Sequence, residues 1–185
     1  MDGDNVREVS ADNEKASFEE VEHLIENGYC NIAMLSGKKM AQVSERRESG
    51  YKRALEKHGF RVREEWIVDC QFDQSTAMQK AMELKRRYPG IDAFFCASDG
   101  IAIGAIDGMM QLGMQVPQDV AVAGFDDFTV SKYIHGGITS VKQYPYEMGV
   151  ACANTVVSMI DGNRVPDWIP MEYKLMKRTS TKAKL

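Results

Sequence analysis

The segment from Ile91 to Asp127 restricts the possible folds of this chain more than any other part of it. It contains two short apolar runs, 92–97 and 120–125, and acidic residues follow both of them. Between the runs, apolar residues recur at helical spacing at Ile101, Ala105, Met109 and Leu112. We expect Asp99 to cap the start of this helix and Gly113 to end it. The pattern therefore predicts a strand, a helix and a second strand.

Two strands joined by one helix and a short return lie parallel in a sheet. Ligands of such sheets bind outside the carboxyl ends of the strands. The pairs Ser98-Asp99 and Asp126-Asp127 both follow strand ends. The segment therefore predicts a pocket for a small molecule.

The rest of the chain alternates between helix and strand patterns in the same way. Helices are predicted near 13–28 and at 44–58, 76–88 and 146–160, and strands at 31–35, 66–68, 139–141 and 169–176. The last strand should lie at an edge, and the basic tail Lys177–Leu185 should be frayed. This alternation predicts the α/β class, with a doubly wound, mostly parallel sheet.

Composition and motifs exclude several functions. A net charge of −4 over 185 residues gives no basic field for nucleic acid, and no apolar run approaches the ~20 residues that span a bilayer. The start of the chain shows no export signal, and the four cysteines form no C-x-x-C pair, so we expect a cytoplasmic protein with reduced thiols.

Patterns typical of enzymes are absent from the sequence. There is no G-x-G-x-x-G, H-E-x-x-H or G-x-S-x-G, and Gly37-Lys38-Lys39 is not a phosphate-binding loop. The three histidines, His23, His58 and His135, have no carboxylate or cysteine partner at a diagnostic spacing. Asp99 and Asp126 could form a catalytic pair, but nothing positions a nucleophile beside them. We therefore expect no enzyme activity, no metal and no cofactor.

Several stretches resemble LacI-type transcriptional regulators. The helix Arg47–Leu55 is similar to the family pattern R-x-x-G-[FY]-x-x-A-[LM], and the segment 97–105 is similar to A-N-D-x-x-A-x-G-A. The segment 116–127 resembles V-P-x-D-[VI] followed by G-[FY]-D-[DN], and 138–143 resembles L-T-[TS]-[VI]-x-Q. These matches occur in order from about residue 10 to 180. Together they indicate the effector-binding, periplasmic-binding-protein-like part of such a regulator.

The resemblance implies a division of the chain. Residues 1–11 correspond to a crossover remnant of a first lobe, 12–143 to the C-terminal effector-binding lobe, 144–165 to a crossover helix of the first lobe, and 166–185 to a returning strand and tail. The helix-turn-helix reader and most of the first lobe are expected to be missing. Such a chain would be a clipped form, a proteolytic fragment or a shortened gene product.

Five residues are candidates for contacts with the effector. The loops Ser36–Arg47, Cys70–Ser75, Ser98-Asp99 and Asp126-Asp127 should converge at one sheet edge. A sugar needs hydrogen-bonding groups for its hydroxyls and a flat apolar surface for its ring. Arg47 offers a planar set of donors, Asp126 a carboxylate, Phe72 a ring, and Ser98 and Gln143 neutral hydrogen bonds.

Each candidate has an alternative structural role. Arg47 could be a solvated charge, Phe72 ordinary core, Asp126 a capping residue and Gln143 part of a hinge. Ser98 stands where the family usually has Asn, which shortens its reach. The loop Lys38–Val43 lacks a polar contact where relatives that bind nucleobases carry Arg and Thr, so a sugar or sugar-like effector is favoured over a nucleobase.

The resemblance implies the sensing and dimerisation core of a regulator, with operator DNA bound only through the missing reader. Met109, Met110 and Met114 are candidates for the homodimer face, with ordinary core as the alternative. A sugar-binding receptor of a transport system would share the fold and the pocket, and is the alternative function. With half of the cleft missing, we expect weak effector binding and no specific DNA binding by this chain alone.

Overall fold

A computed structural model describes residues 6–183 and contains two sheets. The main sheet has six strands in the order β3-β2-β4-β5-β6-β8, and a second sheet pairs β1 with β7. The strands are β1 (Glu8–Ala11), β2 (Ile32–Ser36), β3 (Ile67–Asp69), β4 (Ala93–Cys96), β5 (Ala121–Asp126), β6 (Thr139–Lys142), β7 (Trp168–Met171) and β8 (Lys174–Met176). The α-helices are α1 (Asn13–Glu26), α2 (Gln42–Lys57), α3 (Gln74–Arg87), α4 (Asp99–Gln111) and α5 (Pro145–Ile160).

The strand order places helices on both faces of the main sheet. From β2 the chain moves through α2 to β3 at one edge, whereas from β4 it moves through α4 to β5 in the opposite direction. Because such connections are right-handed, α2 and α4 cover opposite faces. Helix α1 packs against α2, and α3 packs against α4. The sheet is parallel except for β8, which runs antiparallel to β6. The predicted α/β class with a mostly parallel sheet is confirmed.

Both helix pairs approach closely at a glycine. A Cβ added to Gly50 of α2 would lie 2.2 Å from the carbonyl oxygen of Glu14 in α1. A Cβ added to Gly104 of α4 would lie 2.2 Å from the carbonyl oxygen of Gln74 in α3. Neither position accepts a larger residue unless the paired helices move apart.

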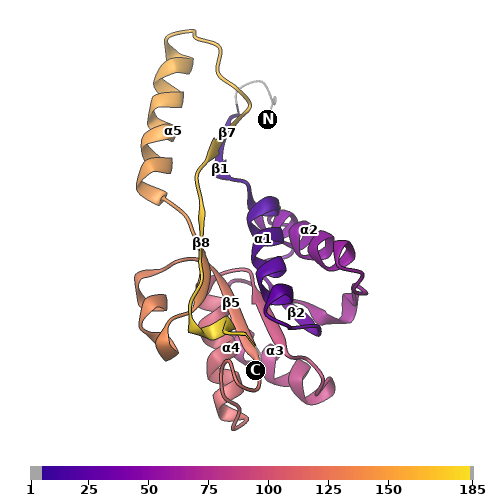
Figure 1. Ribbon diagram of the computed structural model, residues 1–185. Helices are drawn as coiled ribbons and strands as arrows, with labels where there is room; N and C mark the ends of the chain where they lie inside the picture. The colour runs from indigo at the N-terminus through magenta and orange to yellow at the C-terminus, as the bar shows by residue number, and fades with distance from the viewer. Residues whose placement is uncertain (1–5, 184–185) are drawn as a thin grey trace.

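A smaller unit of α5, β1 and β7, here called the α5 unit, extends from one end of the main lobe (Figure 1). Strand β1 pairs in parallel with β7, and none of the residues of α5 is buried. Several apolar side chains of α5 are exposed, including Tyr146 (80%) and Ile160 (78%). The chain passes between the two units after β1, after β6 and between β7 and β8. In the part of the chain that the structure describes, no helix has the length and apolar character needed to cross a bilayer.

The C-terminal segment differs from the sequence prediction in two ways. The predicted strand 169–176 is two strands, because β7 pairs with β1 whereas β8 joins the main sheet. The tail 177–183 is not frayed: Ser180 and Thr181 are buried, and the Ser180 hydroxyl donates to the Val122 carbonyl at 2.6 Å. Residues 184–185 of the predicted tail lie outside the described residues.

The contrast between the two units predicts very different costs for truncating an isoleucine. Ile106→Ala in α4 removes a fully buried side chain and should lower the free energy of unfolding by about 2–5 kcal/mol. Ile160→Ala in the exposed α5 should change it by less than about 0.5 kcal/mol. Urea denaturation of the two variants measures both values. A comparable loss for Ile160→Ala would show that α5 is covered in solution.

Candidate functional site

The five predicted contact residues follow neighbouring strands at the carboxyl edge of the main sheet. From one side to the other, Phe72 follows β3, Ser98 follows β4, Asp126 ends β5 and Gln143 follows β6, while Arg47 lies in the helix after β2. Successive strands are added toward opposite edges of the sheet from β2 and from β4, and the crevice at such a switch in strand order is where ligands of this sheet type bind. Arg47 and Ser98 lie on its two sides. We call this edge the rim.

The buried guanidinium of Arg47 organises the centre of the rim. Arg47 shares the buried side of α2 with Gly50 and Tyr51 and is 4% exposed. Its Nε donates to Asn13 Oδ1 at 2.9 Å, and its Nη1 donates to the carbonyl oxygen of Ala97. Its Cζ lies 3.6 Å from the centre of the Phe125 ring. One side chain thus connects α2 to α1, β4 and β5.

Asp126 completes the charge pair. Its Oδ1 lies 3.6 Å from Arg47 Nη2 and accepts a hydrogen bond of 2.8 Å from Gln143 Nε2. Burial lowers the pKa of Arg47 to about 10, which leaves it a cation at neutral pH. Burial also raises the pKa of Asp126, while Arg47 and Gln143 oppose that rise. Removing one partner of such a pair leaves an uncompensated buried charge. We therefore expect the loss of either side chain to destabilise the rim.

The prediction that Asp99 caps α4 is wrong. The cap is Ser98, whose hydroxyl accepts from the Ile101 N–H at 3.3 Å. Asp99 is instead fully buried and accepts from the Phe128 N–H at 2.7 Å and from two serine hydroxyls at 2.6 Å, those of Ser131 and Ser140. Burial raises its pKa to about 6 despite these three donors. Serine and aspartate are both common helix caps, so residue type alone could not show whether Ser98 or Asp99 caps α4.

Phe72 lies at the β3 end of the rim. Its ring packs against Gly37, since a Cβ added there would lie 2.1 Å from the ring's Cζ. Phe72 is 39% exposed and lies in a turn in which it and Gln71 both have a φ of 55°. Gly37 follows β2, which lies two positions from β5 in the sheet. The structure therefore brings Arg47, Asp126 and Gln143 together and leaves Phe72 further along the same edge.

Sequence reasoning missed two residues of α1. Asn13 holds the Arg47 guanidinium, although the sequence indicated only that a helix begins there. Glu20, two turns further on the same face, is fully buried, and neither carboxyl oxygen has a hydrogen-bond partner among residues 6–183. Burial raises its pKa well above the usual value, and the carboxylates of Asp99 and Asp126 raise it further while Arg47 opposes them. A glutamate amid the apolar positions of α1 was the available signal.

Comparisons with known proteins identify the family of this domain. Residues 21–181 match the model of the periplasmic binding protein-like domain. The chain is 32% identical over 161 residues to "Probable HTH-type transcriptional repressor ExuR" of Bacillus subtilis, covering 86% of this chain and 48% of that protein. It is 30% identical over 176 residues to catabolite control protein A of Priestia megaterium, covering 94% and 53%. The chain thus spans about half the length of these curated relatives.

Solved structures agree with these matches. The transcriptional regulator CelR in complex with cellobiose superposes with a TM-score of 0.90 at 33% identity, over 95% of this chain and 54% of that one. The transcriptional repressor ascG of Escherichia coli superposes with a TM-score of 0.83 at 31% identity, over 94% and 63%.

The buried carboxyl of Glu20 gives a prediction of pH dependence. Its pKa is higher in the folded chain than the ordinary 4.5, so the unfolded chain loses this proton first and stability falls as the pH rises above that value. Glu20→Gln should leave the free energy of unfolding unchanged near pH 4 and raise it by at least about 1 kcal/mol near pH 7.5.

Urea denaturation at the two pH values measures this effect. Glu26→Gln, an exposed change on the same helix, should show no such pH-dependent gain. Equal behaviour of the two variants would show that Glu20 is ionised in the folded chain.

Proposed function

The chain belongs to the family of periplasmic-binding-protein-like domains, in the form found in LacI-type transcriptional regulators, and we propose that it senses a small sugar or sugar-like effector for such a regulator. The observation that carries this proposal is the Arg47–Asp126–Gln143 group, which lies beside the switch in strand order between β2 and β4. The relatives and solved structures named above are regulators, which favours this function over a transport receptor and over an enzyme.

The chemistry of the rim supports a sugar. The Arg47 guanidinium is occupied by protein partners, so the groups left to face a ligand are the half-buried Asp126 carboxylate and Gln143. A carboxylate accepts hydrogen bonds from hydroxyl groups, and the partly exposed Phe72 ring offers a flat apolar surface for a pyranose. Because the two groups lie beside strands that are not adjacent in the sheet, a ligand that contacts both must extend along the edge. The cellobiose bound to CelR is a ligand of that kind.

Regulation would follow from differential binding. A ligand held between the rim and a second lobe favours the arrangement of lobes that binds it best, and an attached DNA-binding head follows that shift. The exposed apolar surface of α5 is what a covering first lobe would bury. Operator DNA would be bound only by a helix-turn-helix domain outside this chain.

The three methionines that were candidates for a homodimer face differ in their exposure. Met109 is fully buried and therefore unavailable to a partner, whereas Met114 is only partly buried against the core. Met110, which is 50% exposed, is the strongest candidate of the three.

A carboxyl-to-amide change at the rim tests the proposed function. Asp126→Asn keeps the shape of the side chain but removes its charge, and should weaken sugar binding about 10- to 100-fold, the usual effect of losing a charged hydrogen bond. Isothermal titration of this chain, and of any longer gene product that contains it, with cellobiose, monosaccharides and hypoxanthine measures the effect. Asp161→Asn, at the exposed end of α5, is the matched control.

The outcomes are distinct. Binding of hypoxanthine but of no sugar would refute the sugar assignment. Sugar binding that Asp126→Asn and Asp161→Asn affect equally would place the site elsewhere.

A further inference from the structure

Two turns at the rim have a positive φ at residues other than glycine. One is Gln71-Phe72 after β3, and the other is Asp126-Asp127 at the end of β5, where the φ angles are 104° and 54°. Such conformations cost free energy for residues with a Cβ and persist only where the surrounding structure holds them. The contacts that hold the second turn therefore help to fix the direction of the Asp126 carboxylate.

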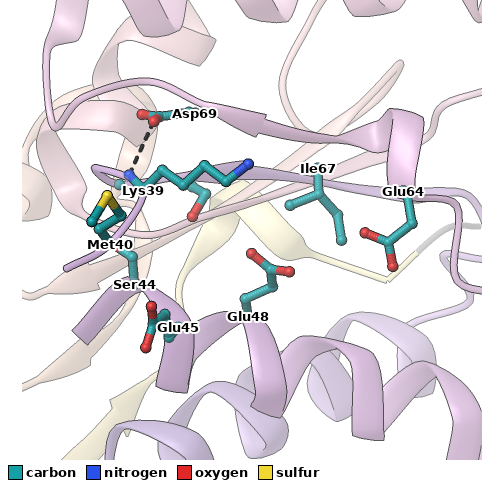
Figure 2. A pocket seen from close by; sticks show the side chains of 10 residues that line it. Lys39, Met40, Ser44, Glu45, Glu48, Glu64, Ile67 and Asp69 are labelled. Carbon is teal, nitrogen blue, oxygen red and sulfur yellow. Dashed lines mark hydrogen bonds between the residues drawn. The ribbon is translucent and has the colours of Figure 1, made fainter. Parts of the chain in front are cut away.

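The turn after β3 is anchored by backbone groups close to it. Asp69, the last residue of β3, accepts from the Gln71 N–H at 2.8 Å and from the Lys39 N–H at 3.0 Å. Figure 2 shows the second of these bonds, which joins the end of β3 to the loop after β2. One carboxylate at the strand end thus holds this turn from within the same part of the rim.

The turn after β5 is anchored by a buried ion pair instead. Asp127 Oδ1 lies 2.5 Å from Arg178 Nη2, and the two side chains are 2% and 14% exposed. The Asp127 N–H also donates to the Ser140 hydroxyl of β6 at 3.0 Å. Arg178 lies 51 residues further along the chain, after β8. The turn that carries Asp126 is thus tied to the C-terminal segment.

Arg178 is itself fixed from several directions. Its Nη1 donates to the Ile138 carbonyl at 2.6 Å, and its backbone N–H donates to Thr139 Oγ1 at 2.8 Å. Its side chain passes over Gly137, where an added Cβ would lie 2.6 Å from Arg178 Cδ. The planar guanidinium therefore holds the Asp127 carboxylate and the Ile138 carbonyl at one fixed spacing. The single ammonium of a lysine cannot reproduce that geometry.

We propose that Arg178 is a positioning residue of the effector site. By holding Asp127, it fixes the turn that keeps the adjacent Asp126 carboxylate facing Arg47 and Gln143. Binding geometry depends on such supporting contacts, because a contact group must be held close to its productive position. The inference rests on the proposed function where it concerns an effector, but the placement of Asp126 can be measured without any ligand.

A titration of the Asp126 carboxyl group by carbon NMR, with Asp126→Asn to assign its signal, is that measurement. Burial raises the pKa of Asp126 above its ordinary 3.8. In Arg178→Lys the turn should loosen and the carboxylate should move toward water, so its pKa should fall toward 3.8. The charged groups that interact with it, Arg47, Asp99 and Glu20, are unchanged in this variant.

Calorimetry with cellobiose measures the effect on binding. Arg178→Lys should weaken the affinity about 3- to 10-fold, which is less than removing the Asp126 charge, because the carboxylate is displaced and not lost. Asp127→Asn removes the ion pair from its other side with a residue that tolerates a positive φ. It should lower both the pKa of Asp126 and the affinity in the same way, and it replaces Arg178→Lys if urea denaturation shows that variant to be unfolded.

Ser180→Ala is the matched control. It removes a buried hydrogen bond of 2.6 Å to the Val122 carbonyl, two positions beyond Arg178 in the same segment. This change should lower the free energy of unfolding but leave the pKa of Asp126 and the affinity for cellobiose unchanged.

Three results would overturn the proposal. An Arg178→Lys chain that is less stable but keeps the affinity would show that the ion pair only stabilises the fold, whether or not the pKa of Asp126 falls. An equal fall of that pKa in Ser180→Ala would show that any loosening of the segment suffices. If the unmodified chain binds no sugar, the proposed function fails and the pKa alone decides: a fall in both ion-pair variants supports positioning by Arg178, and an unchanged value overturns it.

Discussion

The burial of one guanidinium determines the geometry of the rim. A buried cation is tolerated only where charged or polar partners surround it, and Arg47 takes those partners from different elements: Asn13 from α1, the Ala97 carbonyl after β4, and the Phe125 ring and Asp126 carboxylate from β5. The lobe can bury Arg47 only when α1, β4 and β5 are correctly placed around it. The position of the Asp126 carboxylate at the rim is therefore a consequence of the contacts that allow Arg47 to be buried.

The main sheet could be predicted because its strands are continuous apolar runs that end in polar residues. This holds for β2, β4 and β5, which are buried on both faces, as is usual for parallel strands. The division between β7 and β8 could not be predicted. Apolar residues alternate through Ile169, Met171, Tyr173 and Leu175 without a break, and local alternation carries no information about which sheet each half joins.

The candidate site, too, could be predicted only as far as local patterns allow. Arg47, Asp126 and Gln143 were predicted because each follows a strand end or matches a family pattern, and parallel strands bring such positions to one edge. The roles of Asn13 and Glu20 depend on contacts with residues far along the chain, to which no periodicity points. The tail was predicted to fray from its charge alone, although its hydroxyl residues bond into the sheet, as Ser180 does with Val122.

The three crossings between the main lobe and the α5 unit run beside the rim (Figure 1). The first leads directly into Asn13 and the second begins at Gln143, and these are the residues that hold Arg47 and Asp126. Each of these two segments therefore joins the α5 unit directly to a residue that contacts the Arg47–Asp126 pair. A shift of the α5 unit relative to the main lobe would act on Asn13 and Gln143, and through them on the orientation of the Arg47 guanidinium and the Asp126 carboxylate.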